Sequence, residues 1–307
     1  MTVTPASGVE AFASRLAIPA IVAPMFLVSG PDLVVECCRA GLAGTFPALN
    51  QRSSAGFDEW LWEIEERCGP DAAPYGVNLI VHKTNPRVEV DLELCVKHKV
   101  PLVITSLGAV PDLVAAVHSY GGLVFHDVIQ RRHAEKAAEA GVDGIIAVAA
   151  GAGGHAGTLS PFALLSEIRE VFDGPLILSG AMSHGRHIAA AQMMGAQFGY
   201  LGSHFIAAAE SMAGEAQKQM MTEASAKDIT YTDKVTGVGA NFLTPSLASA
   251  TLPDGHGEMT LNDEARAWKT IWSAGHGVGA TRAVRPAADI CAQLIDEYRA
   301  ARTEFCA

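Results

Sequence analysis

Eight apolar runs of strand length recur along the chain, each followed by turn residues and a helical pattern, at a spacing of roughly 20–30 residues. They lie at residues 20–25, 42–47, 75–80, 102–107, 123–128, 144–150, 176–181 and 198–206. Strands that are apolar on both faces are typical of a parallel sheet covered by helices, and this spacing matches a repeated strand–helix unit. The pattern therefore predicts an α/β fold built on parallel strands.

Prolines and glycines predict where the intervening helices begin and end. Prolines suited to the first helical turn stand at Pro31, Pro86, Pro111 and Pro161. Three similar joints, "RAGLAG" (39–44), "EAGVDG" (139–144) and "MMGAQFG" (193–199), place glycines where a helix ends and a strand begins. Glycine supplies the left-handed conformation that such a tight joint needs, so these joints indicate a weakly repeated unit.

Two features decide between a closed barrel and an open doubly wound sheet: the sequence that follows the first apolar run and the number of predicted strands. No G-x-G-x-x-G follows the first run, where the sequence is AIVAPMFLVSG. Eight strands favour a closed (β/α)8 TIM barrel, here a single domain over residues 1–307. Residues 207–270 break the rhythm with a helical stretch, a polar segment and a Gly/Pro-containing loop, TLPDGHGEM. We expect a helical and loop insertion after strand eight that covers the barrel mouth, before a closing helix near 284–301.

Composition bounds the partners and the compartment. Hydrophobic residues make up 49% of the chain and the formal net charge is −11, which argues against nucleic acid or an anionic membrane as a partner. The N-terminus resembles no signal peptide, and no apolar stretch approaches the roughly 20 residues of a membrane helix. The six cysteines form no C-x-x-C pair and no metal-ligand spacing. These features predict a cytoplasmic protein.

Active sites of barrels lie at the C-terminal ends of the strands, and two such ends are rich in small residues. They are "LSGAMSHG" after the seventh predicted strand and "YLGSHF" after the eighth, where barrels commonly hold a phosphate. Hydroxyls of Ser179 and Ser203 and closely approaching backbone N–H groups suit an anion. Together the two segments predict a phosphate-bearing cofactor.

The stretch "AVAAGAGGHAGTLSPF" (147–162) places four glycines and one histidine, His155, after the sixth predicted strand. A glycine turn at a barrel mouth lets the backbone lie against a flat cofactor ring, with His155 facing the same cavity. We therefore interpret His155 as the candidate catalytic residue.

Two hydrolytic alternatives are weaker. His126, His184 and His204 also stand near strand ends, but no H-x-H lies on the first strand and no acid–histidine pair has helical ligand spacing, so no metal site is predicted. Asp127 should point away from His126 because neighbouring strand residues face opposite sides. A G-x-S-x-G nucleophile elbow is absent, which argues against serine hydrolysis.

Several of these segments, in their order along the chain, resemble the nitronate monooxygenases, formerly 2-nitropropane dioxygenases. The segments are Pro24-Met25, "YGVNLI", "AGGHAG", "LSGAM", "YLGSHF", "TGVGANFL" (236–243) and "IWSAGHGVG" (271–279). The Gly-Gly-His turn is shared with FMN-dependent enoyl-acyl-carrier-protein reductases and some NAD(P)H:quinone reductases.

The resemblance implies a TIM barrel that binds FMN without a covalent bond. Asn78 matches the asparagine that contacts the flavin, His155 the histidine beside its reactive face, and His126 a position where a basic residue often meets the ring. The implied cofactor-binding residues are Met25, Asn78, His126, Gly153, Ser179, Gly180, Ala181, Leu201, Gly202 and Ser203. Departures from the family pattern lie at 149–152, Ala181, His204 and His276, around the cofactor and the pocket.

The function expected from the resemblance is oxidation of a small anionic alkyl nitronate by O₂ to a carbonyl compound and nitrite, with FMN as cofactor. An NAD(P)H-dependent reductase of an enoyl thioester or quinone is the first alternative, and a non-catalytic flavin-binding barrel is the second. The oligomeric state is open, with a homodimer as one possibility.

Overall fold

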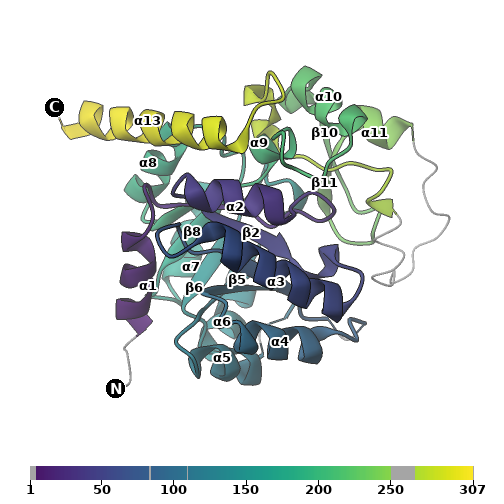
Figure 1. Ribbon diagram of the computed structural model, residues 1–307. Helices are drawn as coiled ribbons and strands as arrows, with labels where there is room; N and C mark the ends of the chain where they lie inside the picture. Colours follow the sequence, from purple (N-terminus) through teal and green to yellow (C-terminus); the bar gives the residue numbers. More distant parts are fainter. Residues whose placement is uncertain (1–4, 83, 109, 250–266, 307) are drawn as a thin grey trace.

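The computed structural model describes residues 5–82, 84–108, 110–249 and 267–306, and its centre is a closed barrel of eight parallel strands (Figure 1). The barrel strands are β1 (Ala20–Val22), β2 (Ala43–Pro47), β3 (Gly76–Ile80), β4 (Leu102–Ser106), β5 (Leu123–Val128), β6 (Gly144–Val148), β8 (Leu176–Ser179) and β9 (Phe198–Leu201). Each pairs with its neighbour in chain order, and Tyr200 of β9 pairs with Ile21 of β1 to close the barrel. The predicted (β/α)8 fold is confirmed.

Helices surround the barrel, and α13 packs along α8 (Figure 1). They are α2 (Pro31–Arg39), α3 (Ser54–Cys68), α4 (Val88–Lys97), α5 (Pro111–His118), α6 (Arg131–Glu139), α7 (Pro161–Arg169), α8 (Gly185–Met193) and α13 (Ala287–Cys306). Prolines begin α2, α5 and α7 as predicted, whereas Pro86 precedes α4 by two residues. At the three similar joints, Gly41, Gly141 and Gly195 have φ of 92°, 81° and 92°, the left-handed conformation expected there.

The eighth predicted strand is wrong over its second half. Strand β9 ends at Leu201, and residues Ser203–Ile206 form a short helix, α9. The N–H of Phe205 donates to the carbonyl of Gly202, so the chain turns at this glycine instead of continuing as a strand.

The insertion at 207–270 contains strands as well as the expected helices and loops. Its elements are α10 (Glu215–Glu223), η2 (Ala226–Asp228), β10 (Ile229–Thr232), β11 (Ala240–Leu243) and α11 (Thr244–Ala248), gathered at one side of Figure 1. Strand β11 pairs antiparallel with β10 and also with β7 (Gly154–His155). The insertion therefore extends the Gly-Gly-His turn into a small sheet. The expected loop TLPDGHGEM (251–259) lies outside the described residues.

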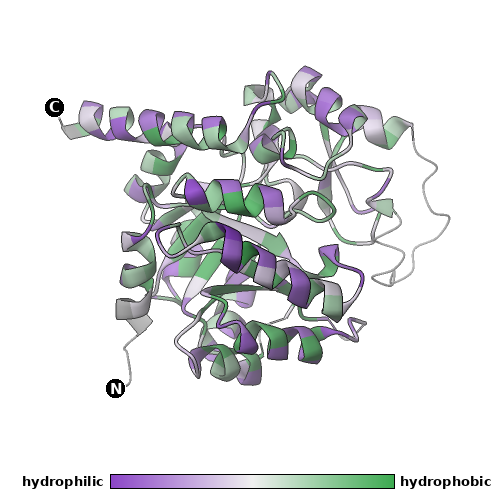
Figure 2. Cartoon of the chain, viewed as in Figure 1, coloured by the Kyte–Doolittle hydropathy of each residue, from purple (hydrophilic) through white to green (hydrophobic). Residues whose placement is uncertain are grey.

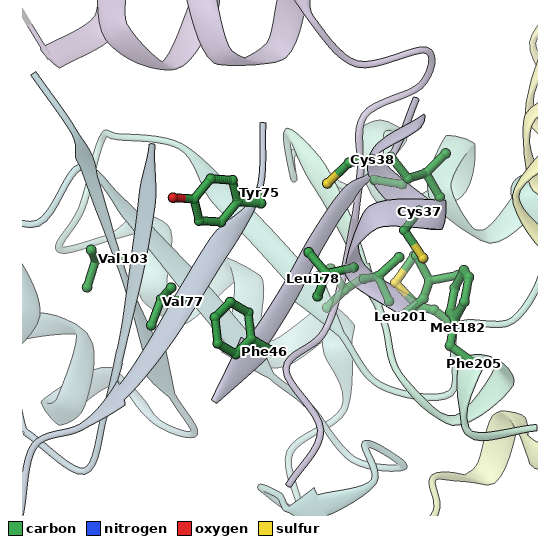
Figure 3. Close-up of a cluster of buried hydrophobic side chains, with 14 of the residues drawn as sticks. Cys37, Cys38, Phe46, Tyr75, Val77, Val103, Leu178, Met182, Leu201 and Phe205 are labelled. Carbon is green, nitrogen blue, oxygen red and sulfur yellow. The ribbon is translucent and has the colours of Figure 1, made fainter. Parts of the chain in front are cut away.

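The hydrophobic core has two layers, one on each face of the barrel wall. Inside the barrel, Phe12 of α1 (Pro5–Ser14) packs edge-on against Phe125 and Phe198, with ring centroids 6.3 and 6.1 Å away, and so closes the N-terminal end. Outside it, Val77, Val103 and Leu178 belong to the cluster that packs the strands against the helices (Figure 3). Figure 2 shows hydrophobic residues concentrated along the strands, while the helices alternate between hydrophobic and hydrophilic residues. None of the described helices is long and apolar enough to cross a membrane.

Candidate active site

A cavity of about 620 Å³ lies at the C-terminal ends of the barrel strands. Its wall combines strand ends, the turn around β7, the insertion and the segment that follows the insertion. The insertion contributes Gln217, Tyr231, Val238 and Trp268, and the segment after it contributes Trp272. The volume falls within the roughly 300–1,000 Å³ of small-molecule sites, at the end of the barrel where active sites are found.

All the predicted site residues line this cavity except Leu201. The side chain of Leu201 is fully buried in the outer core layer, in the same cluster as Cys37 and Phe205 (Figure 3). Strand residues alternate between faces, so the preceding residue, Tyr200, turns into the barrel and lines the cavity instead.

The backbone just after β8 and β9, at Gly180 and Gly202–Ser203, forms a surface of the cavity that we call the cradle. Gly180 has φ of 134°, and a Cβ there would lie 2.9 Å from the carbonyl oxygen of Ala150. At the other strand end, Gly202 leads into α9, whose amino end receives no side-chain cap. Backbone N–H groups at the start of a helix suit an anion such as a phosphate.

The Gly-Gly-His turn packs directly against the segment that follows the insertion. The N–H of Gly275 donates to Ser203 Oγ at 2.7 Å, and a Cβ on Gly153 would lie 2.8 Å from that same nitrogen. The carbonyl of Gly151 accepts hydrogen bonds from the N–H groups of Ala181 (3.2 Å) and His276 (2.9 Å). These contacts fix three chain segments around the cradle, and only glycine at 153 permits the approach.

His155 faces the cavity with a ring nitrogen available. Its Nε2 is buried and has no hydrogen-bond partner among the described residues. Its ring stands edge-on to Trp268, with centroids 5.7 Å apart. Burial lowers the pKa of His155 below its ordinary value, so the imidazole is neutral at pH 7. A neutral imidazole can donate or accept a hydrogen bond at this nitrogen.

His126 is buried and takes part in the barrel wall. Its Nδ1 lies 2.7 Å from Thr105 Oγ1, and burial lowers its pKa to about 4. The ring is therefore uncharged at neutral pH. Asp127 has a different partner, accepting a hydrogen bond from Ser106 Oγ at 2.6 Å, as expected for neighbouring strand residues that face opposite sides.

Besides His155, three buried polar residues in or beside the cavity were not among the predicted site residues: Asp127, Tyr200 and Asn241. Four buried side-chain atoms lack a hydrogen-bond partner within the described ranges: Asp127 Oδ1, His155 Nε2, Tyr200 OH and Asn241 Oδ1. The amide of Asn241, in β11, also donates to the carbonyl of Ala152 at 2.7 Å, beside the Gly-Gly-His turn. Buried polar groups are normally paired, so this concentration points to a polar ligand in the cavity. Alternation along β5 and β9 was the available signal for Asp127 and Tyr200.

No group of three or more His, Cys, Asp or Glu side chains that could hold a metal ion occurs among residues 5–82, 84–108, 110–249 and 267–306.

Comparison with known proteins identifies similar chains. A family model described as nitronate monooxygenase matches residues 13–250, which is more than half of the chain. A nitronate monooxygenase from Paraburkholderia phytofirmans is 27% identical, with 92% of each chain covered. A (3aS,4S,5R,7aS)-5-hydroxy-7a-methyl-1-oxo-octahydro-1H-indene-4-carboxyl-CoA dehydrogenase from Rhodococcus jostii is 25% identical over 76% of this chain, and the match spans 64% of that relative's length.

A solved structure shares the fold over nearly the whole chain. A nitroalkane oxidase from Streptomyces ansochromogenes superposes with a TM-score of 0.82 at 23% identity, covering 96% of this chain and 99% of that one.

Proposed function

Because this chain belongs to the nitronate monooxygenase family, we propose that it is a flavin-dependent oxidoreductase that binds FMN and oxidises alkyl nitronates with O₂ to a carbonyl compound and nitrite. The observation that carries the proposal is one cavity that brings together a glycine-framed cradle and the buried Nε2 of His155, which has no hydrogen-bond partner within the described ranges.

The residues around the cavity fit FMN. The cradle at Gly180 and Gly202–Ser203 suits the phosphate, and the open backbone of the Gly-Gly-His turn suits a flat ring. Asn78 offers its amide oxygen, since both of its amide hydrogens are already used within the barrel wall. When bound, FMN supplies the redox chemistry, and the protein supplies placement and electrostatics.

His155 has the position to orient a nitronate. A nitronate carries its negative charge on two oxygens, and a neutral imidazole donates one hydrogen bond from Nε2 to such an oxygen. Trp268 and Trp272 also line the cavity, Trp268 edge-on to His155, and these aromatic side chains should limit the access of water to this side. In a water-poor site a directed hydrogen bond to an anion is stronger than in bulk solvent.

The test is replacement of His155. The variant His155→Ala should lower the rate of nitrite formation from a short alkyl nitronate by about 100-fold or more while FMN stays bound. His82→Ala, a loop histidine outside the cavity lining, is the matched control and should behave as wild type. Unchanged turnover in His155→Ala would remove His155 from the mechanism.

A second candidate is oxidoreduction of a coenzyme A thioester with a nicotinamide as the electron partner. The Rhodococcus relative, whose printed activity concerns such a thioester, favours it. The rim of the cavity also exposes apolar surface at Leu107, Tyr231 and Val238, where 49%, 46% and 41% of the residue surface is accessible.

Anaerobic spectroscopy separates these candidates. Bleaching of the flavin by a short alkyl nitronate supports the monooxygenase, whereas rapid bleaching by NADH or NADPH and none by nitronate supports the thioester or quinone reductase. A flavin that no electron donor reduces indicates a non-catalytic flavin-binding barrel.

A further inference from the structure

A directional chain of hydrogen bonds crosses three neighbouring strands at the floor of the cavity. The amide Nδ2 of Asn78 donates to the carbonyl of Ile104 at 3.2 Å and to Ser106 Oγ at 2.8 Å. A backbone carbonyl can only accept, so the contact with Ile104 fixes which end of the amide faces the strand. Ser106 Oγ therefore accepts from Asn78 and donates its own hydrogen onward.

Ser106 donates its hydroxyl hydrogen to Asp127, the last member of this hydrogen-bond chain. Ser106 Oγ lies 2.6 Å from Oδ2 of Asp127, which must act as the acceptor. The other carboxylate oxygen, Oδ1, is buried and has no hydrogen-bond partner in the part of the chain that the structure describes, although the residue lines the cavity. The hydrogen-bond chain thus distinguishes the two carboxylate oxygens of Asp127. A proton on Oδ2 would compete with the hydrogen bond from Ser106, whereas a proton on Oδ1 disturbs no existing hydrogen bond.

Among the described residues, no cationic side chain hydrogen-bonds to Asp127. The titratable groups that share the cavity with it are Tyr200 of β9, His155 of β7, Tyr231 of β10, His126 of β5, and His133 and Lys136 of α6. Burial raises the pKa of Asp127 to about 6, and the hydrogen bond from Ser106 opposes part of that rise. Both protonation states are accordingly populated near neutral pH.

We propose that Asp127 is a second acid–base group of this cavity, which takes up or returns a proton at Oδ1 to the ligand group that reaches the floor. The inference rests on the proposed flavin-dependent function, and it concerns a wall of the site separate from His155. When the carboxylate acts as base, the X–H bond of the ligand breaks, the Oδ1–H bond forms, and the electron pair stays on the ligand atom.

This arrangement selects the chemistry of the group that meets the floor. An ionised carboxylate repels an anion and favours a neutral group that donates a hydrogen bond or loses a proton, such as an O–H, an N–H or an activated C–H. The anionic part of a substrate should therefore lie on the side of His155. Ser106 and Asn78 act as positioning residues that keep Oδ1 as the reactive oxygen.

Two substitutions in the FMN-loaded protein test the proposal. Asp127→Asn keeps the shape and an oxygen for Ser106 but cannot exchange a proton. Ser106→Ala removes the hydrogen bond that opposes protonation, so the pKa of Asp127 should rise further. The readout is the infrared band of a protonated carboxylic acid, together with the bound-flavin absorption spectrum, followed from about pH 5 to about pH 8.

In wild type the carboxyl band should titrate near pH 6, as the pKa of Asp127 indicates. The band should be absent in Asp127→Asn and shifted to higher pH in Ser106→Ala, and the flavin spectrum and the pH profile of kcat/KM should follow the same changes. Identical profiles in wild type and Asp127→Asn, with FMN bound and turnover retained, would overturn the proposal and leave Asp127 a structural role. A protein that takes up no FMN at all would instead count against the proposed function itself, so the two failures are distinguishable.

Discussion

The indole of Trp268 stands perpendicular to the imidazole of His155, with an interplanar angle of 89°. The same indole packs against Phe242 of β11, with ring centroids 5.3 Å apart. Strand β11 also pairs with the backbone of His155 through Ala240. The segment after strand eight therefore supplies both the strand that holds the histidine and part of the wall that buries it. The environment of His155 therefore depends on residues that lie far from the Gly-Gly-His turn in the sequence.

Removal of that wall should raise the pKa of His155. In Trp268→Ala the ring gains solvent, so the burial that lowers its pKa weakens and the value moves back towards the ordinary 6.5. Trp268→Phe keeps an aromatic wall and should stay near wild type. Histidine titration by NMR measures both, and an unchanged pKa in Trp268→Ala would show that other contacts desolvate the ring.

The close approach at Gly153 should tolerate no side chain. A Cβ in Gly153→Ala would lie 2.8 Å from the backbone nitrogen of Gly275, so the Gly-Gly-His turn must shift. We expect a loss of about 1–3 kcal/mol in the free energy of unfolding and weaker FMN binding. Gly214→Ala is the control, because no atom of the described residues other than its chain neighbours lies within 4 Å of the added Cβ. Equal stability and FMN affinity of the two variants would contradict this account.

The barrel could be predicted from sequence because its signals are local. Apolar runs of strand length and glycines at helix ends reflect burial on both faces and left-handed joints, which any strand–helix unit needs. The sheet of β7, β10 and β11 gave no such signal. Strand β7 is two residues long, and its pairing with Ala240 and Asn241 is a contact between segments far apart in the chain.

From the residue pattern alone the predicted site is confined to glycine-rich turns, and Met25, Asn78 and His126 were added by the family resemblance. His155, Gly153, Gly180 and Gly202 line the cavity. Leu201 does not, because strand alternation places its side chain on the face opposite to that of Tyr200 within the segment "YLGSHF". The chain from Asn78 through Ser106 to Asp127 depends on the register between neighbouring barrel strands, which the sequence leaves unspecified.

Buried neutral histidines should make the protein sensitive to acid. Burial and the charge of Arg285 lower the pKa of His204 from 6.5 to about 4. Between these values the unfolded chain binds a proton that the folded chain does not, so stability falls as pH drops from 6.5 to about 4. The contribution of His204 is on the order of 3 kcal/mol over that window. His204→Asn should flatten the slope of unfolding free energy against pH in urea titrations, and an unaltered slope would show that His204 does not carry it.

The hydroxyl of Tyr200 should serve the ligand and not the fold. It is buried in the cavity wall and has no hydrogen-bond partner among residues that the structure describes, so Tyr200→Phe removes an unsatisfied group and should leave the FMN-free protein as stable as wild type or more so. Loss of a hydrogen bond between this hydroxyl and the bound ligand should weaken FMN binding by roughly 2- to 10-fold.

Tyr298→Phe is the matched control. The Tyr298 hydroxyl donates a hydrogen bond of 2.7 Å to Gln192 Oε1, and Tyr298 does not line the cavity. The control should lower the free energy of unfolding by about 1 kcal/mol and leave FMN affinity unchanged. Thermal unfolding of the FMN-free chains and fluorescence titration with FMN give both quantities. The reverse pattern, a destabilised Tyr200→Phe with normal FMN affinity, would mean that the hydroxyl supports the barrel.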